Sequence, residues 1–397
     1  MKTRNLIYLA QLEEYDSNRI QSWLKKNPSK NVPEIKQHLK WTPKTILLFT
    51  KVSFLSLFTD NQKALFLTLR ILTPFDTFIK KLIVFLATIK FKIFNKKTTV
   101  IGITGSWGKT TTKETLYHIL KNQKNVAYTP SNHNTLLSIA KQALFLSPKT
   151  KVFITEIGAY QSQDIKKVCN IIHPQIGILT AIGPMHLERF GSLENILKTK
   201  MELAENLPQN GLFFAPQNLS SKLKVFSLPQ NVNYFNDYSD IYYFLGHQFN
   251  LSKDEIKKSI ESIPPTEHRR QIIKNGPITV IDDTYNSNPA GFKLALDELK
   301  KIKSVEKILV TPGMIELGDL QDSENQKIAT YAASICTHII IIGQTNLKNF
   351  QTGIKKSKSK TKVFTASDLK SAQEIIQTIV SKNSAILFEN DLPDNYF

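Results

Sequence analysis

Several features that mark other protein classes are scarce in this chain of 397 residues. It holds only two cysteines, Cys169 and Cys336, which lie far apart and show no metal-ligand spacing. That pattern excludes a disulfide-stapled module and fits a reducing compartment, so we expect both cysteines to be buried structural residues. No internal repeat and no long low-complexity tract is present. A chain of this length is expected to form two or three globular domains.

Acidic residues are scarce as well: 33 Asp and Glu stand against 52 Lys and Arg, a formal charge of +19. Such an excess ordinarily suggests a nucleic-acid-binding protein. Most of it, however, lies within residues 1–98, which hold 18 basic and 6 acidic residues. This local concentration argues against nucleic acid as the partner.

Uninterrupted apolar runs are also missing. Residues 43–97 are rich in Phe, Leu and Ile, but basic residues such as Lys51, Arg70 and Lys80 interrupt every apolar run. Because a helix needs about 20 mostly apolar residues to span a bilayer, no spanning helix is expected here. Two interpretations stay open: helices lying on an anionic membrane surface, or a helical subdomain packed on the rest of the protein. The first 40 residues are polar and offer no secretory signal. We therefore expect a cytoplasmic location, peripheral at the inner face of the plasma membrane under the first interpretation.

After Lys97 short strand-like runs alternate with helical segments, which indicates an α/β fold with parallel sheets covered by helices. The pair Pro264-Pro265 disfavours helix and central strand and is the best boundary between two α/β domains, 98–264 and 265–397. The basic segment 355–362 is expected to be a solvated loop. Strands are expected near 98–104, 151–156, 175–180, 211–215, 278–282, 306–311, 338–342, 362–365 and 384–388, and helices near 111–123, 134–146, 161–172 and 192–206.

The stretch Gly105-x-x-Gly108-Lys109-Thr110 stands between the first of these strands and a helix. In that position backbone N–H groups and the helix N-terminus form a cradle for phosphate. Lysine supplies a positive charge for the β- and γ-phosphates, and the threonine hydroxyl can bind the accompanying Mg²⁺. Ile103 occupies the place of the first glycine of the strict P-loop pattern, which points to a narrower group than ordinary P-loop kinases or GTPases.

Four further motifs follow in order: TEIGA (155–159), a segment containing GPMHLERF (176–203), a segment containing DDTYNSNP (268–296), and GMIELG (313–318). Together with the glycine loop they resemble the Mur ligase family, ATP-dependent amide-forming enzymes of peptidoglycan precursor synthesis, and most closely its D-alanyl-D-alanine-adding members. The resemblance covers residues 98–390. It implies a central P-loop ATPase domain with a parallel sheet, followed by a Rossmann-like C-terminal domain.

The resemblance also implies a reaction and its participants. ATP activates a carboxylate as an acyl phosphate, and an amine then attacks it to form an amide. The expected acceptor is a muramyl-peptide-like cell-wall precursor, the expected amine an amino acid or dipeptide, and the expected cofactors ATP and Mg²⁺. Neither nucleic acid nor a second copy of the chain is expected as a partner.

Site residues follow from matching positions in the motifs. Lys109, His186 and Lys200 are expected to be catalytic, with Lys200 carbamylated; Lys198 is the nearby competitor. Thr110, Glu156 and His186 are expected to bind metal. The residues expected to bind ATP are Gly105, Ser106, Gly108, Lys109, Thr110, Thr111, Arg269, Asp283, Asn286 and Asn288. Asp282 precedes Asp283 in the same strand, and adjacent strand residues point to opposite faces of a sheet. A structural role for Asp282 is therefore as plausible as a functional one.

The sequence also departs from the family's pattern. The usual N-terminal UDP-binding domain is not found, and the basic, hydrophobic, helical region 1–97 occupies its place. NHNTLL (132–137) keeps only part of an Asn-rich acceptor loop, and the acidic C-terminus 386–397 replaces a basic loop. Two alternatives to a ligase therefore stay open: a P-loop phosphotransferase or NTPase, and a membrane-associated scaffold without ligase activity.

Overall fold

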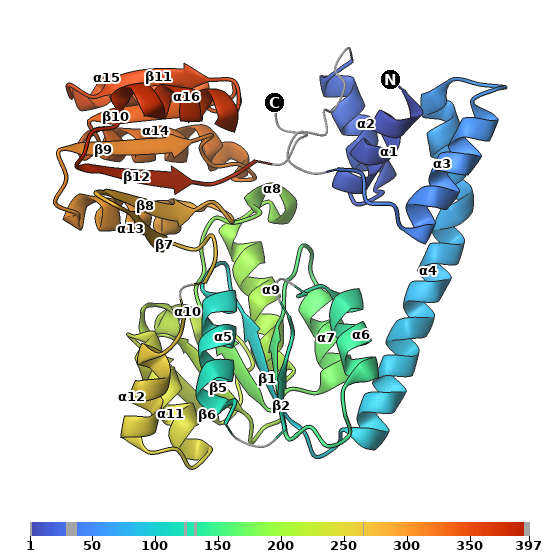
Figure 1. The fold of residues 1–397 in the computed structure, drawn as a ribbon. Coiled ribbons are helices and arrows are strands. Elements are labelled where there is room, and N and C mark those ends of the chain that lie inside the picture. The colour runs from blue at the N-terminus through green and yellow to red at the C-terminus, as the bar shows by residue number, and fades with distance from the viewer. Residues whose placement is uncertain (1, 29–37, 123–124, 131–132, 265, 393–397) are drawn as a thin grey trace.

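The computed structural model describes residues 2–28, 38–122, 125–130, 133–264 and 266–392. Pro265, Asn132 and residues 393–397, on which three of the sequence expectations fall in part, lie outside the described residues. Three parts follow one another along the chain: a group of N-terminal helices and two α/β units, each with its own sheet (Figure 1).

The N-terminal part is helical, as predicted. It consists of α1 (Thr3–Leu12), α2 (Ser17–Lys26), α3 (Pro43–Leu55) and α4 (Asn61–Phe94). Polar caps begin three of these helices: Asp16 accepts from two backbone N–H groups of α2, Thr42 forms a capping box ahead of Pro43, and Asp60 accepts from the backbone of α4. Buried apolar side chains from α1, α3 and the first turns of α4 form one small core.

The helix α4 connects this small core to the first α/β unit. It is 34 residues long and runs down one side of the molecule (Figure 1). Near its C-terminal end, Ala87 and Phe91 are buried in the core that also contains α6 and α7, with Ile83 and Val84 packed beside them. The two ends of α4 are thus packed in two different cores. Within the described ranges, no helix is both long and apolar enough to cross a membrane.

The first α/β unit contains a six-stranded sheet in the order β2-β3-β1-β4-β5-β6, and all its neighbouring strands are parallel. Its strands are β1 (Thr99–Thr104), β2 (Val126–Tyr128), β3 (Val152–Glu156), β4 (Ile176–Leu179), β5 (Leu212–Pro216) and β6 (Asn231–Phe235). Its helices are α5 (Lys109–Leu120), α6 (Leu136–Phe145), α7 (Asp164–Ile172), α8 (Leu187–Phe190), α9 (Leu193–Glu205), α10 (Ser220–Leu223), α11 (Tyr238–Gln248) and α12 (Lys253–Glu261).

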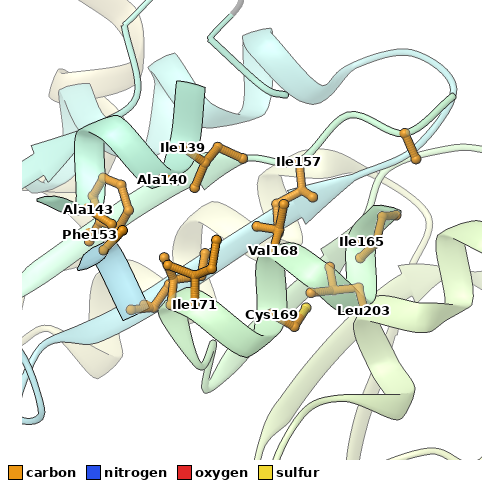
Figure 2. Close-up of a cluster of buried hydrophobic side chains, with 14 of the residues drawn as sticks. Ile139, Ala140, Ala143, Phe153, Ile157, Ile165, Val168, Cys169, Ile171 and Leu203 are labelled. Carbon is orange, nitrogen blue, oxygen red and sulfur yellow. The ribbon is translucent and has the colours of Figure 1, made fainter. Parts of the chain in front are cut away.

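Helices cover both faces of this sheet, because alternate strand residues feed two cores. Val100 packs with residues of α4, α6, α7 and α9, whereas Ile101 and Ile103 pack with residues of α5, α11 and α12. Figure 2 shows the first of these cores, with Ile139 of α6, Val168 of α7 and their neighbours gathered against the strands. The two cores leave the carboxyl ends of β1, β3 and β4 open at one edge, where ligands bind in sheets of this kind.

The second α/β unit contains a six-stranded sheet in the order β11-β10-β9-β12-β8-β7. Its strands are β7 (Gln271–Asn275), β8 (Ile278–Asp283), β9 (Glu306–Thr311), β10 (His338–Ile342), β11 (Lys362–Ala366) and β12 (Ser384–Glu389), and its helices are α13 (Pro289–Lys301), α14 (Gln321–Ala333), α15 (Leu347–Ser357) and α16 (Leu369–Ile379). Only β7 runs antiparallel among the described strands, paired with β8 at the edge.

Most expected elements are present within two or three residues, but some expectations were wrong or incomplete. The segment 355–362 is not one solvated loop, since α15 continues to Ser357 and β11 begins at Lys362. Burial of Phe350 and Ile354 against α14 stabilises that helix. The short or edge strands β2, β6 and β7 were not expected, because exposed edge strands carry little hydrophobic pattern.

Candidate active site

The glycine loop lies where β1 ends and α5 begins. Gly105 has φ +146°, and a Cβ there would lie 2.1 Å from the hydroxyl oxygen of Thr180. Gly108 has φ +83° and is the N-cap of α5. The hydroxyl of Ser106 donates to the carbonyl of Gly183 and accepts from its N–H, both at 3.0 Å, which fixes the loop. The backbone therefore turns tightly and leaves the N-terminus of α5 facing the carboxyl edge of the sheet, as a phosphate site requires.

Lys109 is the first residue of α5 and folds back over this loop. Its Nζ donates to the carbonyl oxygens of Gly105 at 2.8 Å and Ser106 at 3.1 Å. Burial lowers the pKa of the ammonium, an effect that the Glu156 carboxylate partly opposes and that Arg269 reinforces. Exposed Thr111 follows in the first turn of the helix. A phosphate placed in the loop would supply an anionic partner for this half-buried lysine.

Thr110 and Glu156 form a pair of oxygen donors between α5 and the end of β3. The Thr110 hydroxyl donates to Oε2 of Glu156 at 2.7 Å, and Asn134 Nδ2 donates to Oε1 at 2.8 Å, which orients the carboxylate. Within the described residues, no cluster of three or more His, Cys, Asp or Glu side chains could hold a metal by itself. Mg²⁺ bound with a nucleotide takes one or two protein oxygens and completes its shell with phosphate and water, so this donor pair fits.

His186 is held by a residue from the second α/β unit. It is the N-cap of α8 with φ +55°, and its Nδ1 shares a short hydrogen bond with Oε2 of Glu316, which itself has φ +61°. Burial raises the pKa of Glu316, but the hydrogen bond and charge of His186 together with the charges of Arg189 and Arg19 outweigh burial, so the pKa is lowered. An ionised Glu316 fixes the imidazole with its proton on Nδ1. The other ring nitrogen, Nε2, would then carry a free lone pair, which is the arrangement that a metal-binding histidine needs.

Lys200 lies on α9 and is only 5% exposed, whereas Lys198 two residues earlier is exposed. Burial, reinforced by the nearby Lys109, lowers the pKa of Lys200 to about 7. Its Nζ stands 5.8 Å from the ring centroid of Phe190. An amine with that pKa is largely neutral near physiological pH, and a neutral amine is the form that reacts with CO₂.

A small cavity of about 40 Å³ brings these groups together. Lys109, His186 and Lys200 all line it, together with Gly105, Ser106, Asn134, Gly158, Ala159, Tyr160, Met185 and Phe190. Glu156 adjoins it through the hydrogen bond from Asn134. Lys109, His186 and Lys200 therefore lie around one cavity, and their catalytic roles stay predictions.

A second cavity, of about 520 Å³, lies between α5 and the start of the second α/β unit. Thr110, Tyr117 and Tyr128 line one side, and Arg269 and Tyr285 line the other. Arg269 Nη2 donates to the Thr110 hydroxyl at 3.2 Å while its guanidinium lies 4.0 Å from the ring centroid of Tyr285. Aromatic faces beside a phosphate loop suit a nucleoside, which sequence analysis did not assign to these tyrosines.

Three further expected ATP-binding residues, Asp283, Asn286 and Asn288, do not line this cavity. Asn288 is the N-cap of α13 and accepts from the Gly291 N–H at 3.0 Å. Asn286 accepts from the next backbone N–H at 2.9 Å. Burial raises the pKa of Asp283 to about 6, and burial together with Asp283 raises the pKa of Glu389 well above its usual value. The ATP-binding role of Asp283, Asn286 and Asn288 stays a prediction.

A third cavity, of about 550 Å³, lies between the N-terminal helices and both α/β units. Arg189 lies on its wall with its guanidinium 4.4 Å from the ring centroid of Tyr160, which in turn packs edge-on against His186 at 5.2 Å. The cavity therefore adjoins the cluster around His186. The residues from α1, α2 and the turn after α2 that line it are Glu13, Arg19, Ser22, Trp23, Lys26 and Asn27.

Sequence reasoning missed several of these residues. Glu316 belongs to the motif GMIELG and Asn134 to the segment NHNTLL, but neither residue had been assigned a role. His118, which shows no ligand spacing in the sequence, lines the cavity of about 520 Å³ beside the glycine loop. Nothing in the sequence of α2 marks Trp23 or Lys26, because only the fold brings them to the site.

Family comparisons agree with this geometry. The Mur ligase middle domain matches residues 103–260, and the Mur ligase glutamate ligase domain matches residues 268–389. Together the two matches take in well over half of the chain, and α1–α4 fall outside both.

Two curated relatives are both UDP-N-acetylmuramoyl-tripeptide–D-alanyl-D-alanine ligases. The one from Rickettsia prowazekii is 27% identical over 64% of this chain and 67% of its own length. The one from Bacillus subtilis is 24% identical over 74% of this chain and 73% of its own length.

Solved structures show the same fold. MurF from Acinetobacter baumannii has a TM-score of 0.67 at 23% identity, covering 79% of this chain and 77% of that one. MurF from Thermotoga maritima in complex with ADP has a TM-score of 0.67 at 22% identity, and the match covers 79% of this chain and 80% of that one.

Proposed function

The chain belongs to the Mur ligase family of ATP-dependent ligases, and we propose that it joins an amino acid or dipeptide to the carboxylate of a muramyl-peptide precursor. The observation that carries this proposal is the convergence of Lys109, His186 and Lys200 on one cavity beside the Thr110–Glu156 pair. D-Alanyl-D-alanine is the first candidate for the amine, because both curated relatives carry it in their names.

The reaction needs a carboxylate converted into an electrophile. In the proposed first step the acceptor carboxylate attacks the γ-phosphorus of ATP, which forms an acyl phosphate and releases ADP. The amine then attacks the acyl carbon, and inorganic phosphate leaves with the C–O bond electrons. The chain's contribution to the first step is positioning and charge, since phosphoryl transfer offers the protein little covalent chemistry.

Each converging residue has a defined task in this scheme. Lys109 would exchange its two loop carbonyls for phosphate oxygens, and Arg269 would bring a second positive charge from the other α/β unit. Thr110 and Glu156 would hold one Mg²⁺ and His186 a second. These cations neutralise charge on the phosphates and the acceptor carboxylate. Contact between both units encloses the reacting atoms and limits hydrolysis of the acyl phosphate.

We propose that Lys200 is carbamylated. Its burial, its pKa of about 7 and the nearby positive Lys109 all favour replacing the ammonium by an anionic carbamate. A carbamate at this position would lie in the same cavity as His186 and could support the second cation.

The acceptor would enter through the third cavity, in which α2 forms a wall. Lys26 and Arg189 make no ion pair with any described residue, so they are available for an anionic group of the acceptor. Trp23 adds an aromatic side chain to the same wall. We also propose that the chain acts as a monomer. For its location we propose the cytoplasm, with peripheral attachment to the inner face of the plasma membrane through residues 43–97.

Phosphate release by the purified full chain tests the function. UDP-N-acetylmuramoyl-tripeptide and lipid-linked muramyl peptides would each be combined with D-alanyl-D-alanine or single amino acids. Release that requires both an acceptor and an amine, with formation of the amide product, is expected. Release with ATP alone at the same rate would identify an NTPase, and no release would identify a scaffold.

Two matched lysine variants test the acceptor site. Lys26→Ala should raise the acceptor KM about tenfold and leave the ATP KM unchanged, because one charge-assisted contact is lost. Lys25→Ala is the control, since Lys25 does not line the cavity. Equal acceptor KM values in both variants would remove α2 from the acceptor site without affecting the ligase assignment.

A further inference from the structure

A stripe of large apolar side chains lies exposed along α4. We define the α4 stripe as Leu67, Ile71, Phe75, Phe78, Ile79, Leu82, Phe85, Leu86, Ile89 and Ile93, each between 41% and 67% exposed. At 3.6 residues per turn these ten positions fall within an arc of about 120° and extend roughly 39 Å along the helix. With about 200 Å² of surface for each large side chain, on the order of 1,000 Å² is exposed, well above the largest apolar patch of a typical monomer.

The stripe is not the face by which α4 packs on the protein. In the C-terminal half of α4, Ile83, Val84, Ala87 and Phe91 form the packed face, and they fall on the side of the helix opposite the stripe. In the first turns of α4, Ala64, Leu65 and Leu69 pack into the small N-terminal core. The helix therefore carries two apolar faces, of which only one is covered by described residues. Figure 1 shows α4 at the margin of the molecule, with its middle turns away from both sheets. At the turn into α4, Phe54, Leu57 and Phe58 add further aromatic and aliphatic surface, each more than 60% exposed.

Basic residues line one edge of the stripe. Lys63, Arg70, Lys81 and Lys92 are spaced by 7, 11 and 11 residues, intervals that keep them on one side of a helix. All four are exposed, and Arg70, Lys81 and Lys92 make no ion pair with any residue that the structure describes. Residues 43–97 hold ten basic and only two acidic residues.

We propose that the α4 stripe is a membrane-binding surface that lies in the plane of an anionic lipid bilayer. Its apolar side chains enter the boundary between headgroups and acyl chains, and its basic edge contacts lipid phosphates, an arrangement typical of interfacial helices. Charge decides against a second copy of the chain as the occupant. Two such helices facing each other would bring their basic edges together without acidic partners, whereas an anionic surface complements them.

Co-sedimentation of the full chain with lipid vesicles tests this proposal. We expect binding to phosphatidylcholine vesicles containing 30% phosphatidylglycerol and at least tenfold weaker binding to pure phosphatidylcholine. The double variant Phe75→Glu/Phe78→Glu should lower binding to the anionic vesicles at least tenfold. The control Thr73→Glu/Thr77→Glu adds the same charge to the same turns on another, exposed face and should bind nearly as the parent does.

A second variant separates the basic edge from the apolar stripe. Arg70→Gln/Lys81→Gln/Lys92→Gln should weaken binding to anionic vesicles on the order of 100-fold, since each cation near an anionic surface contributes about a factor of five. Thermal unfolding followed by circular dichroism checks that every variant is folded. Point variants are used because removing α4 would strip Ala87 and Phe91 from the core of the first α/β unit.

Three results would overturn the proposal. In the first, the parent protein stays in the supernatant with anionic vesicles. In the second, a folded stripe variant sediments with them like the parent. In the third, neither protein binds vesicles, and the parent forms dimers whereas the stripe variant does not. The last result would assign the stripe to a second copy. This proposal rests on the membrane attachment proposed above for residues 43–97. None of these readouts depends on ligase activity, so it stands or fails separately from the proposed ligase reaction.

Discussion

Lys200 should make the activity of this enzyme depend on both CO₂ and pH. The carbamate forms only from the neutral amine. Burial and Lys109 lower the pKa of Lys200 to about 7, so the neutral form gains as pH rises through 7 and is lost below it. With that pKa about 9% of Lys200 is neutral at pH 6 and about 90% at pH 8, whereas an ordinary lysine of pKa 10.4 would be neutral in only about one molecule in 250 at pH 8.

The expected effect follows from those fractions. Formation of the carbamate from the neutral amine and CO₂ also releases one proton. The concentration of dissolved CO₂ needed for half-maximal activation should therefore be about 1,000-fold higher at pH 6 than at pH 8, about tenfold from the neutral fraction and about 100-fold from the released proton. The assay is ATP-dependent product formation in CO₂-depleted buffer with bicarbonate added back. Incorporation of ¹³CO₂ into a carbamate, followed by NMR, gives a readout that needs no turnover.

Two lysine variants make the result specific. Lys200→Gln cannot be carbamylated and should be inactive and insensitive to bicarbonate, while Lys198→Ala changes an exposed side chain and should respond as the parent does. The reasoning is refuted if CO₂-depleted protein is fully active at both pH values, or if the carbamate signal survives in Lys200→Gln.

Three further predictions concern the glycine loop and the metal pair. Lys109→Ala should lower ATP turnover at least about 1,000-fold without loss of fold, because it removes the positive charge that would face the phosphates. Steady-state kinetics together with a circular-dichroism melt would show this, and parental turnover would contradict it. Glu156→Gln should raise the Mg²⁺ concentration for half-maximal activity at least about tenfold, since a charged oxygen donor becomes neutral. If the variant and the parent need the same Mg²⁺ concentration, the metal binds elsewhere. Gly105→Ala should lower the free energy of unfolding by about 3 kcal/mol, measured by urea unfolding, because the new Cβ would clash with the Thr180 hydroxyl in a strained backbone. The control is Gly276→Ala, where φ is +58° but the space around the Cβ is open, and it should cost only about 1 kcal/mol. Equal losses in the two variants would contradict the steric argument.

The local chemistry of the glycine loop was readable from the sequence because it depends on neighbours in the chain. Two glycines, a lysine and a threonine between a strand and a helix specify a phosphate cradle wherever the strand packs. The alternation of buried strands with amphipathic helices likewise specified the α/β class, and it placed most strands of both sheets within two or three residues. Short edge strands such as β2 escaped because few of their side chains are buried.

The choice between Lys198 and Lys200 shows where sequence patterns stop. Both lie on one helix two residues apart, and only the packing of α9 decides that Lys200 is buried in the cavity while Lys198 is exposed. The pairing of His186 with Glu316 joins residues 130 positions apart, so no local pattern could reveal it.

The sequence alone therefore determined the phosphate loop, the α/β class and the family, because these follow from spacing along the chain. Only the tertiary structure decided that α2 forms a wall of the acceptor-side cavity and that α4 has one covered and one exposed apolar face. Those outcomes depend on which surfaces of distant segments meet, and hydrophobic periodicity identifies an apolar face without identifying what covers it.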